Sequence, residues 1–245
     1  RLVGSEMCIR DSDYRQIKMN ISNDKIYKIG NPRYDRILNN LENVEYKLDH
    51  SIKNEGNILI FASMWDEDNK IIFEKFINSP LVNRFEKVII VPHEVNDYYL
   101  NYYCSVLEDN DFSFKKINQY QNFNQFEEEY IIINKVGFLS KLYAQSTIAY
   151  VGGGFSKSGI HNIIEPAAAS NPVIFGSNFL NSNKSDAEGL IDVSGGFSVD
   201  SYELFSEKIN WLLDENNYNN SSKNCKTFVT ENSGSTEKIL KELYE

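Results

Sequence analysis

The 245-residue sequence contains few cysteines and no CxxC pair. Its three cysteines, Cys8, Cys104 and Cys225, are odd in number and lie far apart in the chain. This pattern favours a reducing compartment and argues against a disulfide scaffold or a structural zinc site. No apolar run approaches the length that a membrane-spanning helix needs. We therefore expect a cytoplasmic protein.

Basic residues are scarce relative to acidic ones. Lys and Arg total 25 against 35 Asp and Glu, which gives a formal net charge of −10. Binding to a nucleic-acid backbone needs a basic face, and a polybasic membrane anchor needs clustered Lys and Arg. The charge balance argues against both. The 41% hydrophobic and 24% charged residues are typical of a globular protein.

Residues 1–12 show neither the period of a helix nor that of a strand. We interpret them as a leader that is not native to the protein, and they are excluded from the fold prediction. Under this interpretation the native N-terminus is missing and the reading frame begins inside a longer gene.

From about residue 56 the chain alternates short apolar runs with helical patterns. Apolar runs without alternation, separated by helices, are typical of a parallel sheet covered on both faces. The sequence therefore predicts an α/β fold with a Rossmann-like parallel sheet. The expected strands cover residues 57–63, 87–92, 112–117, 130–134, 147–152, 172–176 and 196–199. The Asn- and Ser-rich stretch 214–223 is predicted to be a solvated loop.

Several polar and glycine residues follow the predicted strands. They are Ser63, Pro92, His93, Gly137 and the triplet 152–154. Right-handed crossovers place the carboxyl ends of parallel strands at one edge of the sheet, so we expect these residues to converge on one crevice. Taken alone, Ser63 is a weak signal, and a histidine such as His93 is more often packed in a loop than catalytic.

The most informative segment covers residues 150–169. Its pattern predicts a buried strand, a glycine-rich turn, and a helix carrying His161 and Glu165 on one face. Glycines at 152–154 and Gly159 allow the backbone to approach a ligand closely. The start of a helix adds free N–H groups and a partial positive charge. We expect an anion here, and a phosphate fits best.

Other interpretations of this segment are weaker. A dinucleotide fingerprint fails because Lys157 replaces its third glycine, and a Walker loop lacks its Gly-Lys-Ser/Thr. A metal site lacks a third ligand besides His161 and Glu165. A purely structural role stays open, with His161 capping the turn and Glu165 an ordinary first-turn acid. Pro166 removes one helix hydrogen bond and helps to expose that turn.

A second cluster contains Arg33 and Arg36, which follow a Gly-Asn-Pro turn in an otherwise acidic chain. The planar guanidinium group suits phosphate or carboxylate. A surface ion pair with Asp35 or Glu42 is an equally good interpretation of this cluster taken alone.

Four motifs together resemble the C-terminal half of 3-deoxy-D-manno-octulosonic acid (Kdo) transferases, which are GT-B glycosyltransferases. They lie at residues 31–36 (Asn-Pro-Arg-Tyr-Asp-Arg), 92–94 (Pro-His-Glu), 136–143 and 151–168. The His-Asn-x-x-Glu-Pro block beside the three glycines is the most specific part, and the resemblance runs from about residue 24 to the end. It implies that residues 36–245 form the donor-binding domain. Residues 13–35 would be a remnant of the N-terminal domain or of the interdomain linker.

The resemblance implies a role for each matched residue. Arg33 would contact the phosphate of CMP or the anionic sugar of the donor. Pro92 and His93 would wall the cytosine pocket, with the backbone near Gly137 reading the edge of the base. Glu165 would accept hydrogen bonds from the ribose hydroxyls.

The phosphate would be held by the glycine turn and the residues that follow it, with Ser63 lining the same site. The expected phosphate-binding residues are Gly152, Gly153, Gly154, Ser158, Gly159, His161 and Asn162. Two departures from the family pattern bear on this geometry. Ile160 stands where the family has glycine, and Gly-Ser-Asn-Phe at 176–179 replaces a Gly-Pro-Asn block.

The family transfers Kdo from CMP-Kdo to a lipid A precursor with inversion, without a metal or cofactor. Its general base, acceptor site and membrane-contacting surface lie on the N-terminal domain, at the cytoplasmic face of the bacterial inner membrane. We therefore expect no catalytic residue in this chain, which would bind the donor without turning it over. One alternative is another GT-B enzyme with a UDP-sugar, such as a lipid-linked N-acetylglucosamine transferase or a UDP-sugar epimerase. The other is a nucleotide-binding fragment without catalysis.

Overall fold

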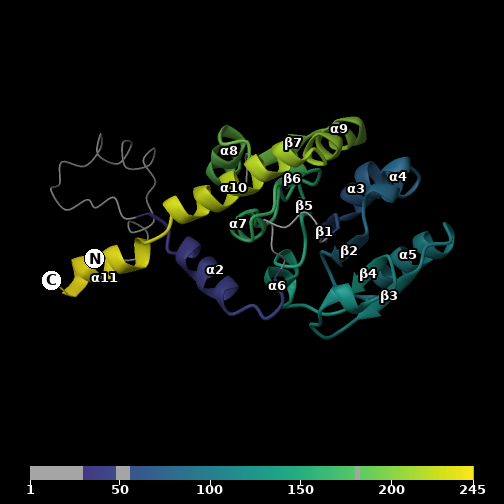
Figure 1. Ribbon diagram of the computed structural model, residues 1–245, viewed down its shortest axis with the longest axis horizontal. Helices are drawn as coiled ribbons and strands as arrows, with labels where there is room; N and C mark the ends of the chain where they lie inside the picture. Colours follow the sequence, from purple (N-terminus) through teal and green to yellow (C-terminus); the bar gives the residue numbers. More distant parts are fainter. Residues whose placement is uncertain (1–29, 48–55, 180–182, 245) are drawn as a thin grey trace.

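The computed structural model describes residues 30–47, 56–179 and 183–244 (Figure 1). The leader expected at 1–12 and residues 13–29 of the expected linker lie outside these ranges. The described residues form a seven-stranded sheet in the order β3-β4-β2-β1-β5-β6-β7, and all its strand pairs are parallel. The strands are β1 (Ile58–Met64), β2 (Lys87–Pro92), β3 (Phe114–Ile117), β4 (Tyr130–Ile133), β5 (Ile148–Val151), β6 (Val173–Gly176) and β7 (Gly196–Val199).

Helices cover both faces of this sheet. The α-helices are α2 (Arg33–Glu42), α3 (Asp66–Asp68), α4 (Glu74–Ile77), α5 (Asp97–Glu108), α6 (Leu139–Tyr143), α7 (Ile164–Ala168), α8 (Lys184–Asp192), α9 (Tyr202–Leu212), α10 (Glu215–Glu231) and α11 (Ser235–Tyr244). A π-helical turn at Asn69–Phe73 joins α3 to α4, and short 3-10 turns lie at Pro80–Arg84 and Phe123–Gln125. In Figure 1, α11 extends beyond α2, at the opposite end of the molecule from α5.

Successive residues along a strand belong to different hydrophobic cores. Leu59 and Phe61 of β1 pack with residues of α4, α5 and α9, whereas Ile58 and Ile60 pack with residues of α6. A strand whose residues are buried on both sides has a continuous apolar sequence without alternation. The predicted α/β class, with a parallel sheet between two layers of helices, is confirmed.

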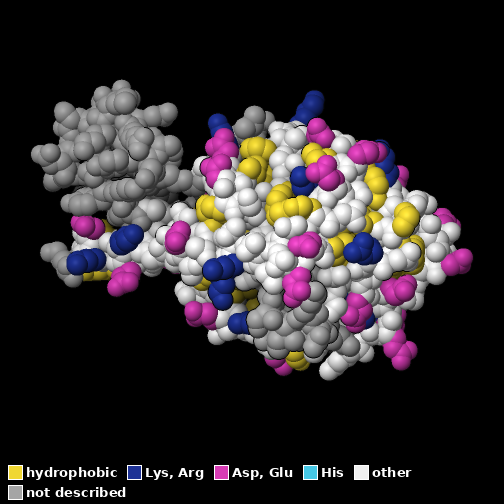
Figure 2. Space-filling model, turned by 45° about the horizontal axis from the view of Figure 1, so that its top comes forward, with side chains coloured by type: hydrophobic (Ala, Val, Ile, Leu, Met, Phe, Trp, Pro, Cys, Tyr) yellow, Lys and Arg dark blue, Asp and Glu magenta, His cyan; other side chains and the backbone are white. Residues whose placement is uncertain are grey.

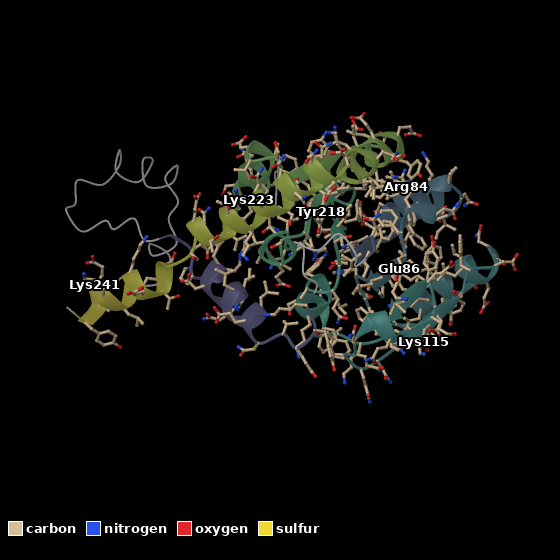
Figure 3. The ribbon with its side chains drawn as sticks, in the orientation of Figure 1. Arg84, Glu86, Lys115, Tyr218, Lys223 and Lys241 are labelled. Carbon is tan, nitrogen blue, oxygen red and sulfur yellow. The ribbon has the colours of Figure 1, made fainter. Side chains whose placement is uncertain are left out.

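The stretch 214–223, predicted to be a loop, is instead the start of α10. Asp214 caps the helix by accepting a hydrogen bond from the amide of Asn217 at 3.1 Å. Cys225 and Val229 are fully buried in the core that also contains α7 residues. Tertiary packing therefore overrides the low helix propensity of Asn and Ser. Tyr218 and Lys223 mark this helix in Figure 3.

The surface agrees with a mixed-charge protein. On the face drawn in Figure 2, acidic and basic side chains are interspersed. Within the described ranges, no helix combines the length and the apolar character needed to cross a membrane.

Candidate functional site

The carboxyl ends of three neighbouring strands bring the main predicted residues together. Strand β1 lies between β2 and β5 in the sheet. The amide of His93, just after β2, donates to the carbonyl of Met64 at 2.9 Å. The amide of Gly152, just after β5, donates to the carbonyl of Ala62 at 2.8 Å. Ser63 sits between these two contacts, at a bulge with φ of 56°.

Gly137 lies farther out along the same edge. It follows β4, which is separated from β1 by β2. It has φ of 94°, and a Cβ atom added there would meet no heavy atom within 4 Å. The structure thus places Gly137 in open space at the sheet edge.

A buried carboxylate anchors the glycine loop. Asp68 Oδ2 accepts hydrogen bonds from the amides of Gly153 at 2.8 Å and Trp65 at 3.1 Å, and Oδ1 accepts one from the Tyr150 hydroxyl at 2.6 Å. The side chain is fully buried, and burial raises the pKa of Asp68 while these hydrogen bonds oppose the rise. Asp68 therefore ties the start of α3, the end of β5 and the glycine loop to one another.

The glycines permit close contacts between backbone segments. Gly153 has φ of 93°, and a Cβ there would collide with the carbonyl oxygen of Gly159. A Cβ on Gly154 would lie 2.5 Å from the Cα of Gly176, at the end of β6. The glycine loop is thus pressed between the ends of β1 and β6, which explains glycine at these positions without reference to a ligand.

Several amides expected to face a phosphate bond within the loop itself. The amide of Ser158 donates to Ser156 Oγ at 3.2 Å, and that of Gly159 donates to the Ser156 carbonyl at 3.4 Å. The amide of His161 donates to the Gly152 carbonyl at 3.2 Å. The backbone amide of Asn178 also contacts the loop, donating to the Gly154 carbonyl at 2.8 Å. The loop is therefore a well-bonded turn, in which these three amides already have acceptors.

The helix after the glycines begins later than predicted. Helix α7 starts at Ile164, so His161 precedes it and does not share a helical face with Glu165. Asn162 causes the difference, because its Oδ1 accepts from the Ile164 amide at 3.1 Å and its Nδ2 donates to Glu165 Oε1 at 2.8 Å. Asn side chains commonly compete with helix hydrogen bonds in this way, so the helix begins only after Asn162. The prediction of one helix carrying both residues was wrong.

Glu165 occupies a partly buried position close to two cations. Burial raises its pKa, while the hydrogen bond from Asn162 and the charges of Arg36 and Arg33 lower it. The ionised carboxylate is therefore less stable here than in water. A ligand that donated hydrogen bonds to it would satisfy that charge.

His161 belongs to a cluster of three aromatic rings. Trp65 and His93 are stacked with ring centroids 3.9 Å apart and an interplanar angle of 18°. His93 and His161 are 4.7 Å apart, and the Trp65 indole N–H donates to His161 Nε2 at 2.8 Å. Burial and the neighbouring His93 lower the pKa of His161. The cluster thus favours the neutral form of His161.

Arg33 lies at the start of α2 and pairs with α8. Its guanidinium donates to Asp186 Oδ2, and its Nη1 donates to Asn183 Oδ1 at 3.3 Å. Asp186 is 1% exposed and also accepts from the Tyr34 hydroxyl at 2.6 Å. Asn183 in turn donates to the carbonyls of Ile160 and His161 at 3.0 and 3.2 Å. The surface ion pair with Asp35 or Glu42 that the sequence suggested does not form for Arg33, which pairs with the distant and buried Asp186 instead.

A surface hollow of about 740 Å³ lies beside this arginine. It is lined by Asn31, Pro32, Arg33, Asp35, Arg36, Asn39, Asn40 and Thr236. No glycine-loop residue lines it, so the hollow is a feature of the α2 surface.

Four residues of this region were not selected from the sequence as site residues. Trp65, Asp68 and Asn183 contact the glycine loop or His161, and Arg36 acts on Glu165. The local signals were the position of Trp65 directly after a predicted strand and the pairing of Arg36 with Arg33 in one motif. Asp68 and Asn183 had none, because their partners lie far away in the sequence.

The arrangement suits an anionic, hydroxyl-bearing ligand more than a metal. Among the described residues, no group of three or more His, Cys, Asp or Glu side chains could hold a metal ion. A carboxylate, an imidazole and a tight glycine turn lie along one strand edge, where ligands bind in open parallel sheets. Hydroxyl groups would match Glu165, and an anion would have to bind through N–H groups other than the three loop amides that already have acceptors.

Comparison with known proteins gives two kinds of similarity. No protein-family model matches the chain. In structure, the chain is similar to the C-terminal CMP-Kdo binding domain of WaaA from Acinetobacter baumannii. The TM-score is 0.60 at 16% identity, and the match covers 80% of this chain and 98% of that domain. The fold is therefore that of the C-terminal domain of GT-B glycosyltransferases.

In sequence, the chain is similar to Kdo transferases over most of its length. It is 27% identical over 243 residues to the 3-deoxy-D-manno-octulosonic acid transferase of Chlamydia trachomatis serovar D, covering 96% of this chain and 55% of that protein. It is also 27% identical over 224 residues to a bifunctional glycosyltransferase/methyltransferase of Fusobacterium nucleatum, covering 89% and 33%. The resemblance inferred from the motifs is confirmed. The chain spans about half the length of the Chlamydia protein and a third of the other.

Proposed function

We propose that this chain is the donor-binding half of a Kdo transferase, which transfers Kdo from CMP-Kdo to a lipid A precursor. The observation that carries the proposal is the similarity to Kdo transferases across 96% of the chain, combined with the GT-B donor-domain fold. The WaaA domain of the same fold is described as binding CMP-Kdo. The whole protein would act in lipopolysaccharide synthesis, peripherally bound at the cytoplasmic face of the inner membrane.

The proposed donor lies along the ends of β1, β2 and β5. Glu165 accepts hydrogen bonds from the ribose hydroxyls, and Pro92 and His93 wall the cytosine, with the backbone at Gly137 near its edge. The glycine turn with Ser63, Ser158, Gly159, His161 and Asn162 surrounds the phosphate.

Arg33 has five N–H donors, and the contacts to Asp186 and Asn183 use two of its three nitrogens. The Nε atom is buried and has no hydrogen-bond partner among the described residues, so in the proposal the remaining N–H groups of the two Nη atoms face the donor while the ion pair stays intact.

The reaction requires groups from the rest of the protein. A base on the second domain takes the proton of the acceptor hydroxyl, which attacks the anomeric carbon of Kdo from the face opposite CMP. The C–O bond to the CMP phosphate breaks, and the phosphate leaves with the electron pair. N–H donors of this chain stabilise that developing charge, with no metal required.

Titration with nucleotides tests the proposal. CMP should bind and raise the melting temperature, and UMP or UDP should bind more weakly. Glu165→Ala should weaken CMP binding about tenfold to a hundredfold, because each lost hydrogen bond to a charged group is worth about 1.5–3 kcal/mol. Glu203→Ala, at a largely exposed acid on α9, is the matched control and should leave the affinity unchanged.

Turnover provides the second measurement. The isolated chain should hydrolyse or transfer CMP-Kdo only at background rate, and adding the other half of a Kdo transferase should restore transfer. Preference for UDP over CMP would instead support an enzyme that uses a UDP-sugar. Tight CMP binding that is unaffected by Glu165→Ala would return Glu165 to a structural role.

A further inference from the structure

Trp65 makes a directional contact with the proposed phosphate site. Its indole Nε1–H donates to His161 Nε2 at 2.8 Å, across 96 residues of sequence. Its ring is stacked on His93 at 3.9 Å, and the three rings form a continuous group with His161. Both the hydrogen bond and the stack therefore fix the orientation of the His161 ring.

The chemistry of the indole group restricts the protonation of His161. An indole N–H can donate a hydrogen bond but has no lone pair with which to accept one. The Nε2 atom of His161 must therefore be unprotonated wherever this bond forms. A neutral imidazole with an unprotonated Nε2 carries its hydrogen on Nδ1. Protonation of His161 to imidazolium would break the bond to Trp65.

The ring edge that remains is the one that carries Nδ1. The Cδ2 edge of His161 faces the glycine loop, 3.2 Å from where a Cβ on Gly153 would lie. Within the described ranges Nδ1 has no hydrogen-bond acceptor, whereas the backbone N–H of His161 donates to the Gly152 carbonyl. The Nδ1–H group is thus oriented away from Gly153.

We propose that Trp65 is a positioning residue that holds His161 as the neutral Nδ1–H tautomer, so that His161 offers an uncharged hydrogen-bond donor to a nucleotide phosphate that lies on the side of the ring away from Gly153. The role toward phosphate rests on the proposed function, whereas the tautomer is a property of the ligand-free chain. Trp65 itself touches His161 and not the reacting atoms.

The charged groups around His161 agree with a neutral imidazole. His93 is the titratable side chain that acts directly on it, and with burial it lowers the pKa of His161. Asp68 is directed to the amides of Trp65 and Gly153, and Glu165 to Asn162. The Arg33–Asp186 pair reaches only the His161 carbonyl, through Asn183. In the described residues these acids have other partners, so none of them is bonded to the imidazole to favour its protonation.

Nitrogen NMR of the ligand-free protein tests the tautomer directly. The sequence has three histidines, His50, His93 and His161, so selectively labelled imidazole signals can be assigned with single His→Gln variants. We expect His161 to show a protonated Nδ1 and an unprotonated Nε2 at pH 7.5. An Nε2–H tautomer of His161 in the wild-type protein would overturn the proposal.

Trp65→Phe removes the donor and keeps a ring against His93. The His161 titration midpoint should rise by about one pH unit, since a lost hydrogen bond of about 1 kcal/mol corresponds to about that shift. Trp211→Phe is the matched control, because Trp211 is partly exposed and packs on Phe197 instead. If Trp65→Phe changes neither the tautomer nor the midpoint, the positioning role is wrong.

The pH dependence of nucleotide binding tests the role toward phosphate. CMP affinity of Trp65→Phe relative to wild type should rise as the pH falls from 7.5 to 5.5, because His161 can then become a cation beside the phosphate. The titration of CMP itself cancels in this ratio, and the ratio for cytidine, which lacks phosphate, should stay constant. A constant ratio for CMP would overturn the phosphate role. If CMP fails to bind at every pH while NMR shows the Nδ1–H tautomer, the proposed function fails and the assignment of Trp65 as the residue that sets the tautomer stands.

Discussion

Removal of the Asp68 carboxylate should destabilise the fold strongly, because it leaves several buried donors at this sheet edge without their acceptor. Asp68→Ala leaves the amides of Trp65 and Gly153 and the hydroxyl of Tyr150 without their acceptor. A buried donor left unpaired costs about 1–3 kcal/mol. Relief of the buried charge, which burial makes unfavourable, offsets part of this cost. We expect a net loss of about 3 kcal/mol, which corresponds to a fall of about 6–12 °C in Tm for a chain of this size.

Urea denaturation measures this loss as a shift in the midpoint at constant slope. Asp68→Asn is the sharper variant, since its Oδ1 can accept from both amides while its Nδ2 donates to the Tyr150 oxygen. It should cost about 1 kcal/mol, because charge-assisted hydrogen bonds become neutral ones. Tyr150→Phe removes a single partner and should fall in the same range. The reasoning is refuted if Asp68→Ala costs less than about 1 kcal/mol, or if Asp68→Asn is as damaging as Asp68→Ala.

Three further predictions follow from the same geometry. Gly153→Ala should lower stability by at least about 2 kcal/mol more than Gly137→Ala, because both have positive φ but only Gly153 faces a collision; equal losses by denaturation would contradict this. Glu165→Gln should stabilise the ligand-free chain increasingly as the pH rises. Because burial raises the pKa of Glu165 in the folded state, its protonated side chain contributes its full stability below pH 4.5. That contribution is lost once the pH exceeds the folded-state pKa, and a pH-independent difference would disprove this. Wild type should lose stability relative to His161→Gln as the pH falls below 6.5, because a lowered pKa in the folded state favours protonation of the unfolded chain; parallel curves would count against it.

The parallel sheet could be predicted from the sequence because each strand carries its own signal. Residues 87–92 and 196–199 were predicted with the bounds of β2 and β7. Helix α10 carried no such signal, since its Asn- and Ser-rich first half has low helix propensity. Its formation depends on burial of Cys225 and Val229 against residues of other helices. That contact is a property of the assembled fold, which a local pattern does not contain.

The candidate site, like the fold, could be predicted only where the signal was local. The glycine turn and the alignment of strand ends came from local patterns and topology. The position of His161 could not be predicted in this way, because the Asn162 side chain delays the start of the helix and the Trp65 indole donates a hydrogen bond to the imidazole. Asp68 and Gly153 are 85 residues apart in the chain, so their hydrogen bond left no spacing to detect. Sequence located the edge of the sheet, and long-range side-chain contacts determined its chemistry.

These contacts bear on how the proposed site stabilises a leaving phosphate. Arg33 is bound to Asp186, which is 1% exposed, and loss of one partner from a buried ion pair costs about 3–5 kcal/mol. Release of Arg33 to the phosphate is therefore unfavourable, and the bound pair instead holds Asn183 against the carbonyls before Asn162. His161, kept neutral by Trp65, likewise offers a dipole instead of a charge. Under the proposed function, preorganised dipoles would stabilise the charge that develops as the bond to CMP breaks. A site that held CMP through full cations would also bind the product tightly, and this would slow its release after each transfer.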